Sequence, residues 1–252
     1  MSDLLAVTFH AEHLERDDVW SHVARAAGAF GRRRIPLTFF VHPLHAIRAG
    51  FDLRARLVEL RDQGHEIGQH THYYARFEQT STGTEKRTSL ESETIERCLA
   101  RDHAYLGEAG FAPAGYVSGG WAIHDEIFAW LRANRFRYDC SFRTYRLPYA
   151  NPAAGAGDDT SGPFWMDRLL EVPTTAGLTN WLRRRQFGRP RPRAGDAARY
   201  ELIYLHDTDL LKWPKRTLFR RVVPFLARGK RVVTAGDLAA AVGPRAARAA
   251  DA

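Results

Sequence analysis

Histidines and acidic residues concentrate in two short stretches of this sequence. The segment GHEIGQHTHYY carries His70 and His72, and the segment VTFHAEH carries His10 and Glu12. Imidazole nitrogens and a carboxylate together form a ligand set suited to zinc and other first-row divalent ions. Such an ion polarises a carbonyl oxygen and lowers the pKa of bound water. The two stretches therefore suggest metal-assisted hydrolysis of an amide or ester, with loss of the metal as the alternative.

Further polar residues follow two other apolar runs. His206 and Asp207 end the run ELIYLHD, and His42 ends the run PLTFFVH. A single histidine in such a place is usually an ordinary surface or core residue. Polar groups at several strand ends indicate a binding or catalytic site more strongly. The carboxyl ends of parallel strands share one edge of a sheet, and ligands bind at that edge. A histidine there is also suited to give a proton to a leaving amine.

The remaining histidines considered lie in helical or loop contexts, where we expect surface or helix residues. They are His13, His22, His45, His103 and His124.

Short apolar runs alternate along the chain with longer segments of helical period. Strands are predicted over residues 4–10, 35–43, 65–70, 113–120, 169–175 and 200–209. Helices are predicted over residues 16–31, 52–64, 88–110, 122–136 and 214–229, and a strand with a short helix over 230–242. This alternation without a break in composition predicts one α/β domain over residues 1–242, with a mostly parallel sheet or barrel. Residues 243–252 are predicted to form a flexible tail.

The composition is that of an ordinary globular protein, with 252 residues, 44% hydrophobic and 26% charged. No run approaches the roughly 20 apolar residues of a transmembrane segment, and the first residues lack the basic start of a secretory signal. We therefore expect a cytoplasmic protein without a transmembrane segment. The two cysteines, Cys98 and Cys140, match no metal or redox spacing.

The net charge of +8 comes largely from arginine, which clusters in residues 31–36, 181–193 and 213–221. Such clusters attract nucleic acid, anionic lipid or phosphorylated sugars. No nucleic-acid-binding motif accompanies them. A solvated arginine-rich surface is therefore the preferred interpretation, and no nucleic-acid partner is predicted.

Several segments resemble, in order, the motifs of the polysaccharide deacetylase family, also called the NodB-homology family or carbohydrate esterase family 4. LRDQGHEIGQHTHYY resembles the family's G-H-E-I-G-x-H-T/S-x-x-H, and ANRFRYDCSF resembles its L-G-F-R-Y-D-S-S. AVTFHAE, PLTFFV and ELIYLHD resemble T-F-D-D-G, A-T-F-F-V and L-x-I-H. The resemblance covers residues 4–240. It implies a distorted (β/α) barrel of about seven mostly parallel strands, and metal-dependent removal of N- or O-acetyl groups from sugars.

The motifs of the metal site are altered in this chain. His10 stands where the family has its base aspartate, and Ala11 where it has its metal-binding aspartate. Glu12 follows one residue later. Tyr74 stands where the second metal-binding histidine is expected, and His72 is the candidate replacement. The arginine of the third motif is also absent.

With these replacements, the resemblance implies a metal site of Glu12, His70 and His72, with a divalent ion, zinc being the first choice. His10 is then a ligand or a base. His206 is implied as the acid that protonates the leaving amine, and Asp207 as the group that orients it. Three aromatic residues are candidates for contact with a sugar ring: Tyr74, Trp121 and Trp165.

The predicted function is removal of an acyl group from an amino sugar during cytoplasmic assembly of a surface polysaccharide such as an O-antigen or a capsule. A nucleotide- or lipid-linked substrate would suit the arginine clusters. Two alternatives stay open. One is a metal-independent amide hydrolase on the same fold, with His10 and Glu12 as its catalytic groups. The other is a sugar-binding protein without catalytic activity.

Overall fold

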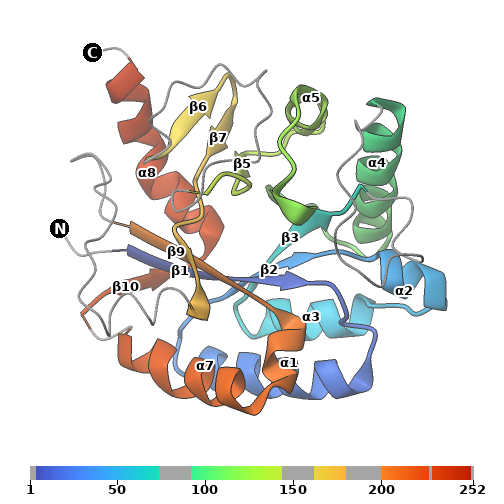
Figure 1. The fold of residues 1–252 in the computed structure, drawn as a ribbon, viewed down its shortest axis with the longest axis vertical. Coiled ribbons are helices and arrows are strands. Elements are labelled where there is room, and N and C mark those ends of the chain that lie inside the picture. The colour runs from blue at the N-terminus through green and yellow to red at the C-terminus, as the bar shows by residue number, and fades with distance from the viewer. Residues whose placement is uncertain (1–3, 74–91, 144–161, 180–199, 227–228, 251–252) are drawn as a thin grey trace.

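A curled, mostly parallel sheet with helices packed around it forms the centre of the computed structural model, which describes residues 4–73, 92–143, 162–179, 200–226 and 229–250 (Figure 1). The strands are β1 Leu4–Ala11, β2 Thr38–Val41, β3 Glu66–Thr71, β4 Gly115–Ser118, β5 Tyr138–Asp139, β6 Phe164–Met166, β7 Leu169–Glu171, β8 Ala176–Gly177, β9 Tyr200–His206 and β10 Arg231–Val233. Their order is β6-β7-β5-β4-β3-β2-β1-β9-β8, and β10 also pairs with β1. The α/β class and the mostly parallel sheet are confirmed.

The strand count differs from the expectation, whereas the curled sheet agrees with the predicted distorted barrel (Figure 1). The described residues form ten strands rather than about seven, because segments of two or three residues at the sides of the sheet add short pairings. β6 is the one antiparallel strand among them. In the described part of the chain, the end strands β6 and β8 do not pair with each other, so the sheet is a half-barrel.

Seven α-helices and two short 3₁₀ turns accompany the sheet in the described residues. The helices are α1 Asp17–Gly31, α2 Leu44–Ala49, α3 Arg54–Asp62, α4 Ser92–Glu108, α5 Asp125–Ala133, α7 Trp213–Leu226 and α8 Ala235–Ala250; the turns are η1 Gly119–Trp121 and η2 Asp207–Leu211. α1, α3 and α7 lie along one side of the sheet (Figure 1). No helix in the described part is long and apolar enough to cross a membrane.

The sequence pattern explains why these segments form these elements. In α1, apolar residues at helical spacing form the buried face of the helix: Val19, Val23, Ala26, Ala27 and Phe30. Almost every residue of β1 is buried, as expected for a central parallel strand covered on both faces. The main core packs Phe9 of β1 between Phe39 of β2 and Phe219 of α7, with ring centroids 4.8 and 5.2 Å away. This core holds the central strands in a fixed register.

The C-terminal segment differs from the predicted flexible tail. α8 continues through residues 243–250, and the indole N–H of Trp165 donates to the carbonyl of Gly243 at 3.0 Å. Alanine and arginine dominate this segment and have high helix propensity. Pro244 lies within the helix and does not end it. α8 therefore continues past residue 242.

Candidate functional site

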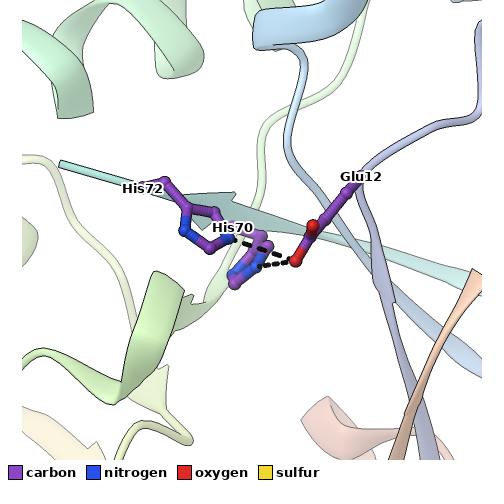
Figure 2. A group of neighbouring side chains, drawn as sticks. All are labelled: Glu12, His70 and His72. Atoms are coloured by element: carbon purple, nitrogen blue, oxygen red, sulfur yellow. Dashed lines mark hydrogen bonds and ion pairs between the residues drawn. The ribbon is translucent and has the colours of Figure 1, made fainter. Parts of the chain in front are cut away.

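Three side chains converge at the carboxyl ends of β1 and β3. The Nε2 atoms of His70 and His72 lie 3.3 and 3.1 Å from Oε1 of Glu12. Figure 2 shows both imidazoles projecting from the end of β3 toward the carboxylate, which follows β1. The three ligand atoms lie within 4.8 Å of one another, the arrangement of a group that could hold a metal ion. The predicted ligand set is therefore assembled in space.

The hydrogen bonds of His70 test whether a metal fits this group. Its Nδ1 lies 2.8 Å from the carbonyl oxygen of Val117. Because a carbonyl only accepts, Nδ1 carries the hydrogen and Nε2 of the neutral ring presents its lone pair to Glu12. A lone pair and a carboxylate attract only through a cation between them, either a proton or a metal ion. A carbonyl that fixes the tautomer of a ligand histidine is also typical of metal sites, so these residues fit a divalent metal.

The two neighbouring imidazoles favour the ionised form of the Glu12 carboxylate. Burial opposes ionisation of Glu12, but its interactions with the close His70 and His72 rings outweigh burial and hold the pKa of Glu12 well below its usual range. The Glu12 side chain is 22% exposed and that of His70 is 1% exposed. One carboxylate and two imidazoles therefore meet at a site that is open on the side of Glu12.

His10 lies beside this group rather than in it. The parallel register pairs His10 of β1 with His206 of β9, and the His10 ring lies 4.7 Å from the His70 ring. Burial, followed by the nearby charges of His70 and His206, lowers the pKa of His10 well below its usual value. His10 is therefore a neutral imidazole at the place where a base was expected, and it is not one of the three converging ligands.

His206 lies at the open side of the group. Its Nε2 is 3.8 Å from Oε1 of Glu12, and its side chain is 41% exposed. Burial of the ring is the main reason that its pKa is lowered. The predicted acid is thus placed next to the predicted ligands, with a neutral ring at neutral pH.

Asp207 does not orient His206 through the hydrogen bonds of its carboxylate. Its two oxygens accept from the backbone N–H groups of His13 and Thr208, both at 2.7 Å. Asp207 begins the turn η2, and these two bonds hold its carboxylate against the backbone. Asp209 instead accepts the backbone N–H of His206 at 3.3 Å. Asp207 is fully buried, which raises its pKa to about 6.

The three predicted aromatic contacts have different outcomes. Trp121 lies at the site, because its ring is 5.2 Å from His10 and 4.9 Å from Tyr204. Trp165 is 40% exposed on β6, and its indole bonds to α8 rather than to any of the histidines. Tyr74 lies outside the described residues.

The sequence analysis did not single out Tyr204 or Asp102, although both contact the histidines. Tyr204 stacks on His10 at 4.9 Å, and its position two residues before His206 on a strand predicts that it shares a face with it. Asp102 of α4 lies 3.3 Å from Nδ1 of His42, which also lies 3.2 Å from the carbonyl of His70. No local pattern connects Asp102 with His42, because 60 residues separate them.

Comparison with known proteins shows which solved structures share this fold. No family model and no curated protein matches the sequence. Among solved structures, a protein from Mycobacterium smegmatis assigned as a polysaccharide deacetylase matches with a TM-score of 0.65 and 17% identity over 97% of this chain and 92% of its own.

Two further structures bear on the site. A family 4 acetyl xylan esterase from Clostridium thermocellum, in complex with a cobalt ion, matches with a TM-score of 0.51 and 15% identity over 94% of this chain and 90% of its own. A CE4 family pseudoenzyme from Bacillus anthracis matches with a TM-score of 0.53 and 12% identity over 94% of this chain and 65% of its own. The chain therefore has the fold of the polysaccharide deacetylases and family 4 carbohydrate esterases, a fold that both enzymes and a pseudoenzyme share.

Proposed function

We propose that this protein is a metal-dependent, deacetylase-like hydrolase that removes an acyl group from an amino sugar. The observation that carries the proposal is the convergence of His70 and His72 on Glu12, with the lone pair of His70 directed at the carboxylate. The fold supports the same class of reaction. The replacements of the family aspartate and of the second ligand histidine thus form a rebuilt site.

In this proposal, Glu12, His70 and His72 hold a divalent ion, with zinc the first choice. When bound, the ion would polarise the acyl carbonyl and make a water molecule easier to deprotonate. His206 is partly exposed and neutral, so its ring can take a proton from the attacking water and return it to the amine as the C–N bond breaks. His10 is also neutral, but its 3% exposure makes it less accessible to a substrate.

We further propose that the substrate is an acylated amino sugar, nucleotide- or lipid-linked, in cytoplasmic surface-polysaccharide assembly. Trp121 beside His10 offers an indole for the apolar face of a sugar ring. The arginine clusters would suit the phosphates of such a carrier; the 181–193 cluster lies outside the described residues.

A sugar-binding protein without turnover is the second candidate. His10 in place of the base aspartate and the similarity to a pseudoenzyme favour it. A metal-independent hydrolase is the third, because the neutral His206 can move a proton without a metal.

Elemental analysis of protein purified without a metal-affinity tag tests the proposal, together with release of acetate from N-acetylated amino sugars. We expect bound metal and activity in the parent, and loss of both in Glu12→Ala and His70→Ala. His22→Ala is the control, because His22 lies on α1 and contacts Arg216 instead of the site. Activity that survives a chelator would support the metal-independent hydrolase, and binding without turnover would support the sugar-binding protein.

A further inference from the structure

A second group of metal-ligating side chains lies outside the site described above. His13, Glu15 and His45 each offer a ligand atom, and these atoms lie within 4.8 Å of one another. Nδ1 of His13 is 3.4 Å from Oε1 of Glu15, and the rings of His13 and His45 are 4.3 Å apart. His13 and His45 were predicted from the sequence to be surface or helix residues. In the structure they are half-buried against each other.

The fold fixes the position of this group from two separate segments. His13 and Glu15 lie in the turn between β1 and α1, where the N–H of His13 donates to the buried carboxylate of Asp207 at 2.7 Å. The N–H of Arg16 closes this turn on the carbonyl of His13 at 3.2 Å. His45 lies in the first turn of α2. A ligand held by all three residues would join α2 to the turn that follows Glu12.

The donor types indicate which ligand would bind. Two imidazoles and one carboxylate suit zinc, cobalt or nickel, whereas calcium and magnesium prefer oxygen ligands. Zinc-to-donor distances of about 2.0–2.2 Å in a tetrahedron place neighbouring donors roughly 3.3–3.6 Å apart. The 3.4 Å between His13 and Glu15 agrees with this spacing. The Glu15 side chain is 13% exposed and that of His13 is 25% exposed, so water can complete the coordination.

We propose that His13, Glu15 and His45 form a second binding site for a first-row divalent metal ion, separate from the group of Glu12, His70 and His72. The two groups are neighbours, because Glu12 and His13 are consecutive and the ring of His42 lies between them. That ring is 5.0 Å from the His72 ring and 6.3 Å from the His45 ring. The proposal of a second site rests on the contacts among His13, Glu15 and His45, and it does not depend on hydrolase activity.

Metal stoichiometry separates the two sites. The tag-free full chain is stripped with a chelator, titrated with zinc, and assayed by calorimetry and elemental analysis. We expect two equivalents in the parent, one in His45→Ala, one in His70→Ala and none in the double variant. His22→Ala is the matched control and keeps two equivalents. Circular dichroism checks that each variant is folded. Glu15→Gln removes the same equivalent with a smaller change in packing.

The results distinguish the two proposals. One equivalent in the parent that persists in His45→Ala and Glu15→Gln, but disappears in His70→Ala, overturns the second site and leaves the proposed function intact. One equivalent that disappears in His45→Ala and persists in His70→Ala supports the second site and contradicts the metal site of the proposed function. Titration with cobalt gives an independent readout. Its visible absorption decreases by about half in each single variant if both sites bind.

Discussion

The two ends of β3 carry histidines in opposite situations. His65, just before the amino end, uses both ring nitrogens for the backbone: Nδ1 accepts the N–H of Leu37 at 3.2 Å, and Nε2 lies 3.1 Å from the carbonyl of Ala27. His70, near the carboxyl end, uses one nitrogen for the carbonyl of Val117 and directs the other at Glu12. Both residues are buried, at 4% and 0% exposure. Burial alone therefore does not separate a structural histidine from a candidate ligand.

The number of backbone hydrogen-bond partners of the ring distinguishes His65 from His70. A ring with two backbone partners has no lone pair left for a ligand, whereas a ring with one partner keeps a lone pair in a fixed direction. The amino end of β3 packs against backbone from α1 and the start of β2, which supplies both partners of His65. The carboxyl end meets the residues after β1, where Glu12 lies. Glu12→Gln and His65→Ala test this difference, and Glu171→Gln and Asp207→Asn test buried carboxyl groups elsewhere in the sheet region; the four changes run from the largest expected effect to the smallest.

Glu12→Gln should give the largest effect, a loss of zinc affinity at the His70 group of about two orders of magnitude or more. Structural zinc sites gain about 10–16 kcal/mol from four ligands, so one charged ligand contributes roughly 3 kcal/mol. Calorimetric titration of the His45→Ala background, which isolates this site, measures the affinity. An unchanged affinity would show that Glu12 is not a ligand.

His65→Ala should lower the free energy of unfolding by about 2–4 kcal/mol and leave the zinc affinity unchanged. The substitution removes two buried hydrogen bonds and opens a cavity. Urea denaturation of the metal-free protein measures the stability. His65→Gln, which can keep one of the two bonds, should cost less. If zinc binding fell in both variants, the distinction between the two ends of β3 would be wrong.

Glu171→Gln should flatten the dependence of stability on pH. Burial, followed by the charge of Asp139, raises the pKa of Glu171 well above its usual value, and burial raises that of Asp139 to about 6. The folded state therefore keeps protons that the unfolded state loses, so stability falls as pH rises from about 4.5 toward these raised pKa values. Each such group contributes up to about 1.4 kcal/mol per pH unit.

Urea denaturation between pH 5 and 8 measures this slope. The Glu171→Gln variant should lose the Glu171 part of the slope. Glu59→Gln is the control, because Glu59 is exposed on α3, and it should reproduce the parent slope. Equal slopes in the parent and Glu171→Gln would contradict a proton held by this buried pair.

Asp207→Asn should have the smallest effect, a loss of about 1 kcal/mol in the free energy of unfolding. The amide keeps one acceptor oxygen, so only one of the bonds from His13 and Thr208 is retained. Because the Asp207 carboxylate does not bond to the His206 ring, the acetate-release rate should change less than about twofold. A much larger loss of rate at unchanged stability would restore the orienting role that the sequence suggested.

Sequence reasoning predicted the residues of the site better than their roles. His70, His72, Glu12 and His206 were identified from strand-end positions and from the family resemblance, and they lie together in the structure. The carboxylate of Asp207 accepts from the backbone N–H groups of His13 and Thr208 rather than from the His206 ring, because adjacency in the sequence does not imply side-chain contact. Trp165 was a candidate for contact with a sugar ring, and its indole bonds to α8.

The sequence by itself determined the alternation of strands and helices, because apolar periodicity is a local property, and it placed the histidines at strand ends. Only the tertiary structure decided which nitrogens are free to bind a ligand. That choice depends on backbone groups distant in the sequence, such as the carbonyl of Val117 at His70 and that of Ala27 at His65. It also brought His45 against His13, since their contact requires α2 to pack beside the end of β1.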